Sequence, residues 1–481
     1  MYGTIKPQRI RDPLHNLVEF GTDQFEHVLW QVIKTRPFQR LRRVRQLGFS
    51  ELVYPGATHT RFAHSVGAFH TARQLMRIIK RHIGRQDRQV KEHQLQVALA
   101  AALVHDIGHG MFSHAFEDVG KKLNLKMAHH EYVSDLLIRD SEVSEAFKSE
   151  MGSGFATDVA DVIGRGRPGN LYDAVVSSQF DADRLDYMQR DRLMAGVQNS
   201  GIDFVWLMAN LEIGTVPIGA DEQQAGEVET FVLGPKASYA AETYVLALFQ
   251  LYPTVYFHKA TRAAEKMFSA LMIHLINLVR DGQEDKTGLP AIHPIVRFAR
   301  EPDQIARALS LDDTVFWGGL PMLDEAPDPL VRDLATRLRD RRLPKCVDIY
   351  QRLVSVMAPA HAPTLQDREA RKKRLKRAIS SIEERLQAWS NEKSEIIPRI
   401  LTDKAERPPY KSFQDSKGPL NQIRIRLGNQ KILDLEESSR VVAAIETFEL
   451  FRAYFDEADS EAKNMIESVV NEELRSNGDG N

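Results

Sequence analysis

The sequence predicts a mainly α-helical protein with a small β-hairpin and a C-terminal region in which helices mix with strands. Two observations lead to this fold class. Apolar residues recur at helical spacing through most of the chain up to about residue 281. Two β-prone stretches, Leu211–Ile218 and Glu227–Leu233, flank the polar segment Gly219–Gly226, a pattern typical of a hairpin.

The expected elements follow in chain order. Helical spacing predicts helices within 23–48, 61–83, 91–107, 129–140, 172–195 and 237–281. Prolines and short helical pieces occupy 285–363, and 367–389 is charged and strongly helical. Residues 407–436 have strand and turn character, and helix is expected again over 438–475. We place the main boundary near residue 285, between a domain of residues 1–285 and a C-terminal region, 286–481, for assembly or regulation.

Composition is that of an ordinary globular enzyme. The chain has 481 residues, of which 43% are hydrophobic and 27% charged. Its richest apolar stretch, Val97–Val104, is far shorter than a membrane span, and the N-terminus lacks the apolar core of a signal peptide. The single cysteine, Cys346, excludes an internal disulfide framework and a cysteine-rich zinc site. A cytoplasmic protein without a membrane partner is expected.

The formal net charge is −2, so the whole molecule is not a polycation that coats nucleic acid. Positive charge is nevertheless concentrated in two runs, Lys34–Arg45 and Arg371–Arg377. The first run lies near the histidine-rich segment, which favours an anionic ligand there. For the second run, a solvated helix face and an anion-binding surface remain equal alternatives. The two runs together allow single-stranded nucleic acid as a candidate partner.

Histidines are crowded into one part of the chain. Ten of the 16 lie between His59 and His130. Histidine is the commonest metal ligand and the usual acid–base residue near neutral pH, so this crowding indicates a functional site.

The strongest single feature is the pair His105-Asp106, which ends a buried apolar helix and is followed by Gly108, His109 and Gly110. Imidazole and carboxylate together suit a divalent cation such as Mn, Fe, Zn or Ni, with Mg less favoured. Other helices must supply the remaining ligands. His64 opens one helix, and Asp183 shares one face of another helix with Tyr187 and Asp191, which follow at intervals of four.

In this order the residues resemble the H…HD…D signature of the HD superfamily. The similarity extends beyond the signature to the deoxynucleoside triphosphate triphosphohydrolases, which include bacterial enzymes and the vertebrate sterile-alpha-motif relative, over roughly residues 8–275. The segments that carry it are 11–15, 38–41, 45–48, 54–59, 61–67, 105–114, 130–131, 183–191 and 256–259.

The resemblance implies an HD-domain helical bundle that cleaves deoxynucleoside triphosphates to deoxynucleoside and triphosphate. It implies four metal ligands: His64, His105, Asp106 and Asp183. Residues that contact the phosphates or move protons would be Arg61, His109, His114 and His130. Substrate contacts near the sugar would come from Gln46, Leu47, Tyr187, Asp191 and Tyr256, and further phosphate contacts from Arg184 and Lys259. For the proton donor to the leaving 5′ oxygen, His114 is the first choice and His130 the second.

Two positions depart from the family pattern. Glu117 stands where the vertebrate relative has aspartate; a carboxylate is retained, so its role in orienting a histidine is expected to survive. Lys34 stands where guanine-activated relatives have an acid that reads the activator's guanine edge. Lysine cannot accept those hydrogen bonds, so activation by GTP is not expected, although Arg42 keeps a basic contact nearby. A different anionic effector, or none, is consistent with this change.

The resemblance also implies a homo-oligomer. Two alternatives remain open: an HD phosphohydrolase that acts on another phosphoester, such as a nucleoside monophosphate or an oligonucleotide, and a non-catalytic regulator that binds nucleotides or nucleic acid.

Overall fold

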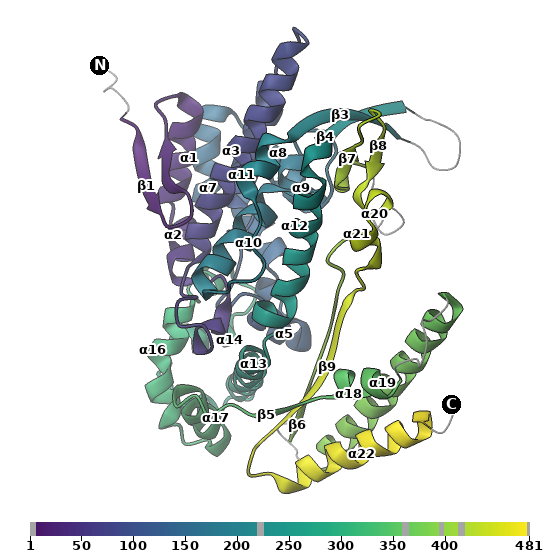
Figure 1. The fold of residues 1–481 in the computed structure, drawn as a ribbon. Coiled ribbons are helices and arrows are strands. Elements are labelled where there is room, and N and C mark those ends of the chain that lie inside the picture. The colour runs from purple at the N-terminus through teal and green to yellow at the C-terminus, as the bar shows by residue number, and fades with distance from the viewer. Residues whose placement is uncertain (1–5, 219–225, 358–364, 394–398, 412–418, 479–481) are drawn as a thin grey trace. The chain divides into compact units, whose positions relative to one another are not determined.

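The computed structural model describes residues 6–218, 226–357, 365–393, 399–411 and 419–478 (Figure 1). It is mainly helical with a few small sheets, which confirms the predicted fold class. The chain forms two compact units that alternate along the sequence. The first unit comprises 1–256, 290–319 and 409–445, and the second comprises 257–289, 320–408 and 446–481. The division at residue 285, which concerns function, stays a prediction.

The first unit holds most of the helices. Its elements are β1 Gln8–Asp12, β2 Asn16–Phe20, α1 Gln24–Lys34, α2 Arg36–Arg40, η1 Leu41–Arg43, η2 Gly48–Leu52, α3 Arg61–Arg85, α4 Glu92–Val104, α5 His114–Leu123, η3 Lys126–Ala128, α6 His130–Arg139, α7 Glu142–Met151, α8 Phe155–Arg165, α9 Ala174–Ser177, α10 Ala182–Ala195, α11 Phe204–Ala209, β3 Leu211–Ile218, β4 Gly226–Leu233, η4 Pro235–Ala237, α12 Ser238–Leu251, η5 Tyr252–Tyr256, α14 Pro294–Arg300, α15 Ile305–Ala308, η7 Pro419–Asn421, β7 Arg424–Arg426, β8 Ile432–Asp434, α20 Leu435–Ser438 and α21 Arg440–Ala444; α16, Asp313–Asp324, begins in this unit.

Helices α3 and α4 form the centre of this unit. The hydroxyl of Thr60 caps α3 by accepting from the Ala63 amide. From Val97 onward helix α4 is apolar on every side, and all residues from Val97 to Val104 are buried, because α3 and α8 pack against it. The end of α4 therefore places the residues that follow it in the interior of the unit.

Two further strands join the predicted hairpin. Strands β3 and β4 pair antiparallel with Leu211 opposite Leu233, which confirms the hairpin; the predicted turn lies outside the described residues except for Gly226. Strand β4 then pairs in parallel with β7, and β7 pairs antiparallel with β8, which gives the order β3-β4-β7-β8.

The second unit is a smaller assembly with its own core. Its elements are α13 Lys259–Arg280, η6 Glu284–Thr287, α17 Pro329–Arg339, β5 Lys345–Asp348, α18 Ile349–Val356, α19 Leu365–Lys393, β6 Ile400–Arg407, β9 Phe448–Phe455 and α22 Ser460–Gly478. The sheet has the order β5-β9-β6, and α18, α19 and α22 enclose an apolar core with it.

Several predicted helices are shorter than the periodicity suggested. The segment 23–48 breaks at Thr35, whose backbone is extended, because Pro37 fits only the first turn of a new helix. The segment 172–195 breaks at Ser178–Asp181, and 237–281 is interrupted by the π-helical turn η5, which contains Pro253.

Four strand regions were not predicted: β5, β6, β9 and the β1–β2 hairpin. The expectation of helix over 438–475 is wrong at β9, where Phe448–Phe455 pairs with both β5 and β6 and is largely buried. The hairpin of β1 and β2 was not predicted; its strands pair with Gln8 opposite Phe20, and Asn16 takes a positive φ of 62° at the turn.

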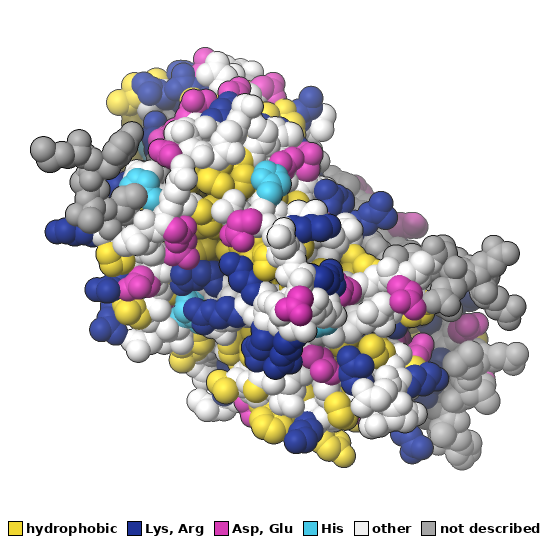
Figure 2. All heavy atoms as spheres, turned by 90° about the horizontal axis from the view of Figure 1, so that it is seen from above, with side chains coloured by type: hydrophobic (Ala, Val, Ile, Leu, Met, Phe, Trp, Pro, Cys, Tyr) yellow, Lys and Arg dark blue, Asp and Glu magenta, His cyan; other side chains and the backbone are white. Residues whose placement is uncertain are grey.

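The surface carries mixed charge. On the face drawn in Figure 2, Lys and Arg side chains are interleaved with Asp and Glu side chains, in keeping with the net charge of −2. Within the described residues, no helix is both long enough and apolar enough to cross a membrane.

Candidate active site

Three helices of the first unit bring the predicted metal ligands together. His64 lies in the first turn of α3, and His105 and Asp106 follow directly after α4. Asp183 lies in the first turn of α10, whose N-cap Asp181 accepts from the Arg184 amide. The ligands that are distant in sequence therefore converge at helix ends, where the backbone direction is fixed by packing and capping.

The two histidine rings aim at one carboxylate oxygen. Nε2 of His64 is 2.9 Å, and Nε2 of His105 is 3.5 Å, from Oδ1 of Asp183. Within the described residues, both nitrogens are buried and neither makes a hydrogen bond. Unpartnered buried nitrogens are costly, and a shared cation would satisfy both. The ligand atoms of these three residues lie within 4.8 Å of one another, so the set fits a divalent metal.

Electrostatics at this point favour positive charge. Burial alone lowers the pKa of His64, but the carboxylates of Asp183 and Asp186 outweigh it and raise the pKa to about 10. Burial also lowers the pKa of His105, and Asp106 and Asp183 reverse this to a net rise. The same carboxylates would stabilise a metal ion, which competes with protons for the imidazole nitrogens.

Asp106 borders this cluster and is held by Arg61. The Arg61 guanidinium donates to Oδ2 of Asp106 through Nη1 and to the Ser113 hydroxyl through Nε at 2.8 Å. Oδ1 of Asp106 lies 3.5 Å from Nε2 of His105. Burial raises the pKa of Asp106, but Arg61 and His105 bring it well below its usual range. Arg61, predicted to contact phosphate, is buried and paired with a predicted metal ligand.

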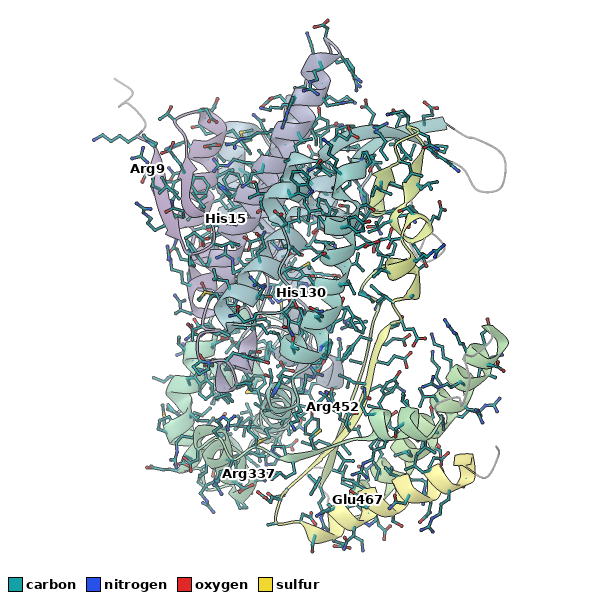
Figure 3. All side chains as sticks on the ribbon, in the orientation of Figure 1. Arg9, His15, His130, Arg337, Arg452 and Glu467 are labelled. Atoms are coloured by element: carbon teal, nitrogen blue, oxygen red, sulfur yellow. The ribbon has the colours of Figure 1, made fainter. Side chains whose placement is uncertain are left out.

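The His64 ring is held on its Nδ1 side by Asp186, a residue that sequence reasoning did not assign to the site. Nδ1 of His64 donates to Oδ2 of Asp186 at 2.8 Å, so the lone pair of Nε2 faces Asp183 and His105. Asp186 also accepts from Nε2 of His15 at 2.7 Å and from Arg190, which in turn binds Asp12. Figure 3 labels His15, which comes from the β1–β2 turn.

A signal for this support was present in the sequence. Asp12 and His15 belong to a segment used for the family resemblance, and Asp186 follows Asp183 by three residues on α10. Without the structure, nothing indicated that Asp186 points toward α3 rather than into the substrate space.

A second group contains the predicted catalytic histidines. The rings of His109 and His130 stack with centroids 3.9 Å apart, and the His114 ring packs edge-on against both. Glu117 joins the set, because Oε2 accepts from Nδ1 of His114 at 3.1 Å and Oε1 accepts from Nδ1 of His130. Figure 3 labels His130, at the start of α6.

This group differs in charge from the first. Burial, Arg61 and His130 lower the pKa of His109 well below its usual value, so this imidazole is neutral at pH 7. Burial raises the pKa of Glu117, but the bonds from His114 and His130 bring it well below its usual range. Glu117 is therefore an anion that orients two histidines. His114 is the solvent-facing member, with 70% of its side chain exposed.

Aromatic and acidic residues predicted to meet the sugar also cluster. Asp191 is buried; Oδ1 accepts from Nε2 of His59 at 2.7 Å and Oδ2 accepts from the Tyr256 hydroxyl at 2.9 Å. The Tyr187 ring lies 6.2 Å from the Tyr256 ring and 6.4 Å from the His64 ring, measured between centroids. Tyr187 thus links the metal-ligand cluster to the Asp191 cluster.

The remaining predicted contacts are less uniform. Arg184 binds the Asp181 carboxylate at 2.7 Å and the Ser178 carbonyl, so its guanidinium is already engaged. Gln46 donates its backbone amide to His59, and its side-chain oxygen is buried without a hydrogen-bond partner among the described residues. Leu47 packs against the core of the first unit. Lys259 belongs to the second unit, so its prediction as a phosphate contact stays a prediction.

Part of the first basic run has structural partners, and the anionic ligand expected there stays a prediction. The guanidinium of Arg40 is buried and donates to the carbonyls of Leu311, Ile107 and His109. Arg43 pairs with Asp312 at 2.6 Å, and Arg42 lies over the Phe62 ring. Arg40 therefore holds the loop after α4, whereas Arg42 and Arg43 remain exposed to solvent.

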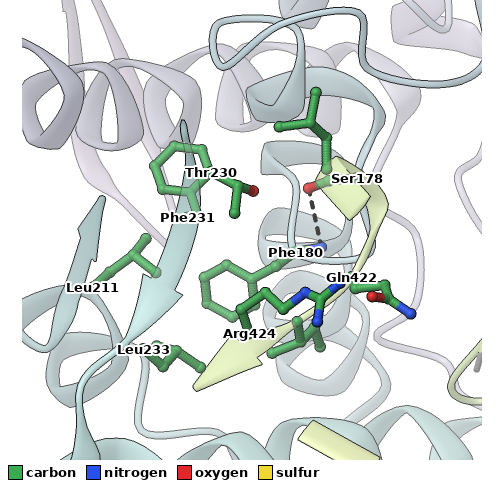
Figure 4. Close-up of a pocket in the computed structure, with 10 residues that line it drawn as sticks. Ser178, Phe180, Leu211, Thr230, Phe231, Leu233, Gln422 and Arg424 are labelled. Carbon is green, nitrogen blue, oxygen red and sulfur yellow. Dashed lines mark hydrogen bonds between the residues drawn. The ribbon is translucent and has the colours of Figure 1, made fainter. Parts of the chain in front are cut away.

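A recess next to the segment that leads into α10 does not extend the site. Ser178 and Phe180 line it with residues of β4 and β7, including Arg424 (Figure 4). Its volume of about 10 Å³ accommodates one water molecule. Within the described residues, the buried amide of Gln422 and Nε of Arg424 have no hydrogen-bond partner, which fits an ordered water and not a nucleotide.

Comparisons with known proteins identify an HD domain in the segment that contains the predicted metal ligands. Residues 61–188 match the model of the HD domain, and residues 226–289 match that of the HD associated region. The uncharacterized protein YwfO of Bacillus subtilis is 30% identical over 345 residues, which are 71% of this chain and 72% of that protein. The deoxynucleoside triphosphate triphosphohydrolase SAMHD1 of Bos taurus is 31% identical over 219 residues, 40% of this chain and 36% of that protein. A solved phosphohydrolase from Bacteroides thetaiotaomicron superposes with a TM-score of 0.67 at 23% identity, over 94% of this chain and 100% of that one.

Proposed function

Because the chain belongs to the HD-domain family, we propose that it is a metal-dependent phosphohydrolase that cleaves deoxynucleoside triphosphates to deoxynucleoside and triphosphate. One observation carries the proposal. The unpartnered Nε2 atoms of His64 and His105 converge on Asp183 beside a separate group of histidines. A cation site next to acid–base groups is the combination that phosphoester hydrolysis requires.

The metal would be held by His64, His105 and Asp183, with Asp106 at the border of the set. Mn, Fe, Zn, Ni and Mg remain candidates, with nitrogen ligands favouring the first four. When bound, the cation would offset negative charge on the phosphoryl oxygens and lower the pKa of a water molecule.

The chain's own residues would position the triphosphate and move protons. Neutral His109 can donate a hydrogen bond to a phosphate oxygen. The proton for the leaving 5′ oxygen would come from His114, held by Glu117 yet open to solvent, with His130 as the alternative. Arg61 would act mainly by holding Asp106, since its guanidinium is buried against that carboxylate.

Selection of the deoxy sugar is assigned to the aromatic group. Tyr187 lies between His64 and Tyr256, where a ring packed against C2′ would leave no room for a ribose hydroxyl. Asp191 would fix this group through its bonds to His59 and Tyr256. The similarity to deoxynucleoside triphosphate triphosphohydrolases of the SAMHD1 type supports the choice of substrate. Gln46, Leu47, Arg184 and Lys259 stay as proposed substrate contacts.

Three further expectations accompany this proposal. Lys34 is exposed and offers no acceptor to a guanine edge, so a nucleotide effector of another kind, or none, is proposed. A homo-oligomer and a cytoplasmic location remain predictions from the sequence.

The test is turnover of the four deoxynucleoside triphosphates and GTP with Mn²⁺ or Mg²⁺, with products separated by chromatography. Deoxynucleoside plus triphosphate, lost in His105→Ala, is the expected result. Hydrolysis of a nucleoside monophosphate or an oligonucleotide instead would assign the site to another phosphoester. Absence of turnover with every metal and with mixed nucleotides present would contradict the enzymatic assignment.

A further inference from the structure

The second unit contains a group of cations that is separate from the proposed active site. Helix α19 carries seven Lys and Arg residues within ten positions: Arg368, Arg371, Lys372, Lys373, Arg374, Lys376 and Arg377. Six of them are exposed, and Arg371 is half-buried. We call them the α19 cations. The long nitrogen-tipped side chains that project from α19 are visible in Figure 3.

These cations are not neutralised by ion pairs. Among the described residues, none of the seven makes a salt bridge. Other arginines of the second unit are paired with carboxylates, as in Arg262–Asp403, Arg337–Asp456, Arg352–Glu467, Arg385–Glu472, Arg399–Asp459 and Arg452–Asp348. Positive charge left unpaired within about two and a half turns of one helix creates a local attraction for anions.

The direction of the side chains follows from the buried stripe of the helix. Leu375, Ala378 and Ile379 are buried in the core of the second unit. At 100° per residue, Lys373 and Arg377 lie opposite this stripe. Lys372 and Lys376 lie on a flank near Glu449 of β9. The α19 cations therefore surround every side of the helix that is not buried.

We infer that the α19 cations bind the phosphate backbone of single-stranded nucleic acid, without reading its sequence. A polyanion matches unpaired cations at short intervals, and phosphate contacts of this kind supply affinity that is independent of sequence. A flexible single strand can follow cations around a helix. A rigid duplex, whose persistence length is about 150 base pairs, would reach only those on one side.

An anionic membrane fits these observations less well. Helices that lie on membranes insert a free apolar face below the headgroups. The apolar face of α19 is already occupied by the core of the second unit, since Ile382 and Leu386 are buried there as well. Only charge would remain to attract a bilayer.

The test is fluorescence anisotropy of labelled 20-nucleotide oligo(dT) and oligo(U) with the full chain, at about 50–300 mM KCl. The variant K373A/R374A/R377A removes three exposed cations and is compared with R77A/R81A/R85A, which removes three exposed arginines from α3. The α19 variant should lose at least about tenfold in affinity at about 100 mM salt. The slope of log K against log salt concentration should become less negative by about 2, since each of the three lost phosphate contacts to a single strand contributes about 0.7 to that slope. The α3 variant should bind like the parent.

Circular dichroism melts should be the same for all three proteins, since the substituted side chains are exposed. Three results would overturn the inference: no binding by the parent, unchanged binding by the α19 variant, or duplex bound as tightly as single strands. Binding to phosphatidylserine vesicles but not to oligonucleotides would assign the surface to membranes instead. These readouts do not depend on hydrolysis, so they are independent of the proposed function.

Discussion

Replacing Asp186 with asparagine tests how the candidate metal centre is held. The carboxylate receives hydrogen bonds from His64, His15 and two nitrogens of Arg190, at 2.7–3.0 Å. Asparagine turns one acceptor oxygen into a donor, so two of these four donors face an NH₂ group. Loss of a residue that orients a ligating histidine costs about 10–100-fold in metal affinity, or about 1.4–2.7 kcal/mol. Titration calorimetry with Mn²⁺ measures this directly.

Stability gives a second readout of the same change. Breaking one partner of a buried ion pair costs about 3–5 kcal/mol, because a charge is left uncompensated. Asp158→Asn is the matched control, since Asp158 pairs with His93 at 2.8 Å but 49% of its side chain is exposed. Such surface pairs contribute about 0–1 kcal/mol. If folded Asp186→Asn binds Mn²⁺ as tightly as the parent and Asp158→Asn, the argument that Asp186 positions His64 is refuted.

Three other predictions concern the same unit. Gly67→Ala would place a Cβ 2.1 Å from Oδ1 of Asp186 and 2.2 Å from Nη2 of Arg190, so it should lower the free energy of unfolding in urea by about 1–3 kcal/mol. Gly84→Ala on the same helix is the control: its Cβ would have no atom within 4 Å, so this substitution should stabilise the protein. Glu117→Gln leaves His114 and His130 without their anion and should reduce kcat by about 10²–10⁴-fold with little change in the melting temperature; unchanged kcat would contradict the orienting role. Burial raises the pKa of Asp313 to about 7, so the folded state binds its proton more tightly than the unfolded chain and stability falls as pH rises from about 4 to about 7. Asp313→Asn should make this part of the unfolding profile flatter, and identical slopes would count against the shifted pKa.

Part of this molecule could be predicted from its sequence. Helical periodicity located α3, α4 and α6 closely, and the HD-type motif indicated His64, His105 and Asp183, which the structure brings together. Periodicity reports which face of a segment is buried, and motifs report residue types in order. Both signals are local, so they work where one helix supplies one ligand.

The rest depended on contacts between distant segments. The sequence does not show that Arg40 folds back onto the carbonyl groups after α4, or that Asp12 reaches Arg190. It also gave no reason to expect strand at Phe448–Phe455, because the neighbours that make it a strand lie about 50 and 100 residues earlier, in β6 and β5. Side-chain direction on α10, which separates Asp183 from Asp186, likewise required the packed helices.

The pairing of β4 with β7 has a consequence for biosynthesis. Val232 pairs with Arg424, so a nascent chain leaves the edge of β4 open until roughly 190 further residues have been translated. At the usual 5–20 residues per second, a ribosome needs about 10–40 s for that stretch. During this interval the unpaired strand edge is exposed to other nascent chains and to chaperones. Slow translation after residue 233 would therefore lengthen the time for which this edge is open to wrong pairing.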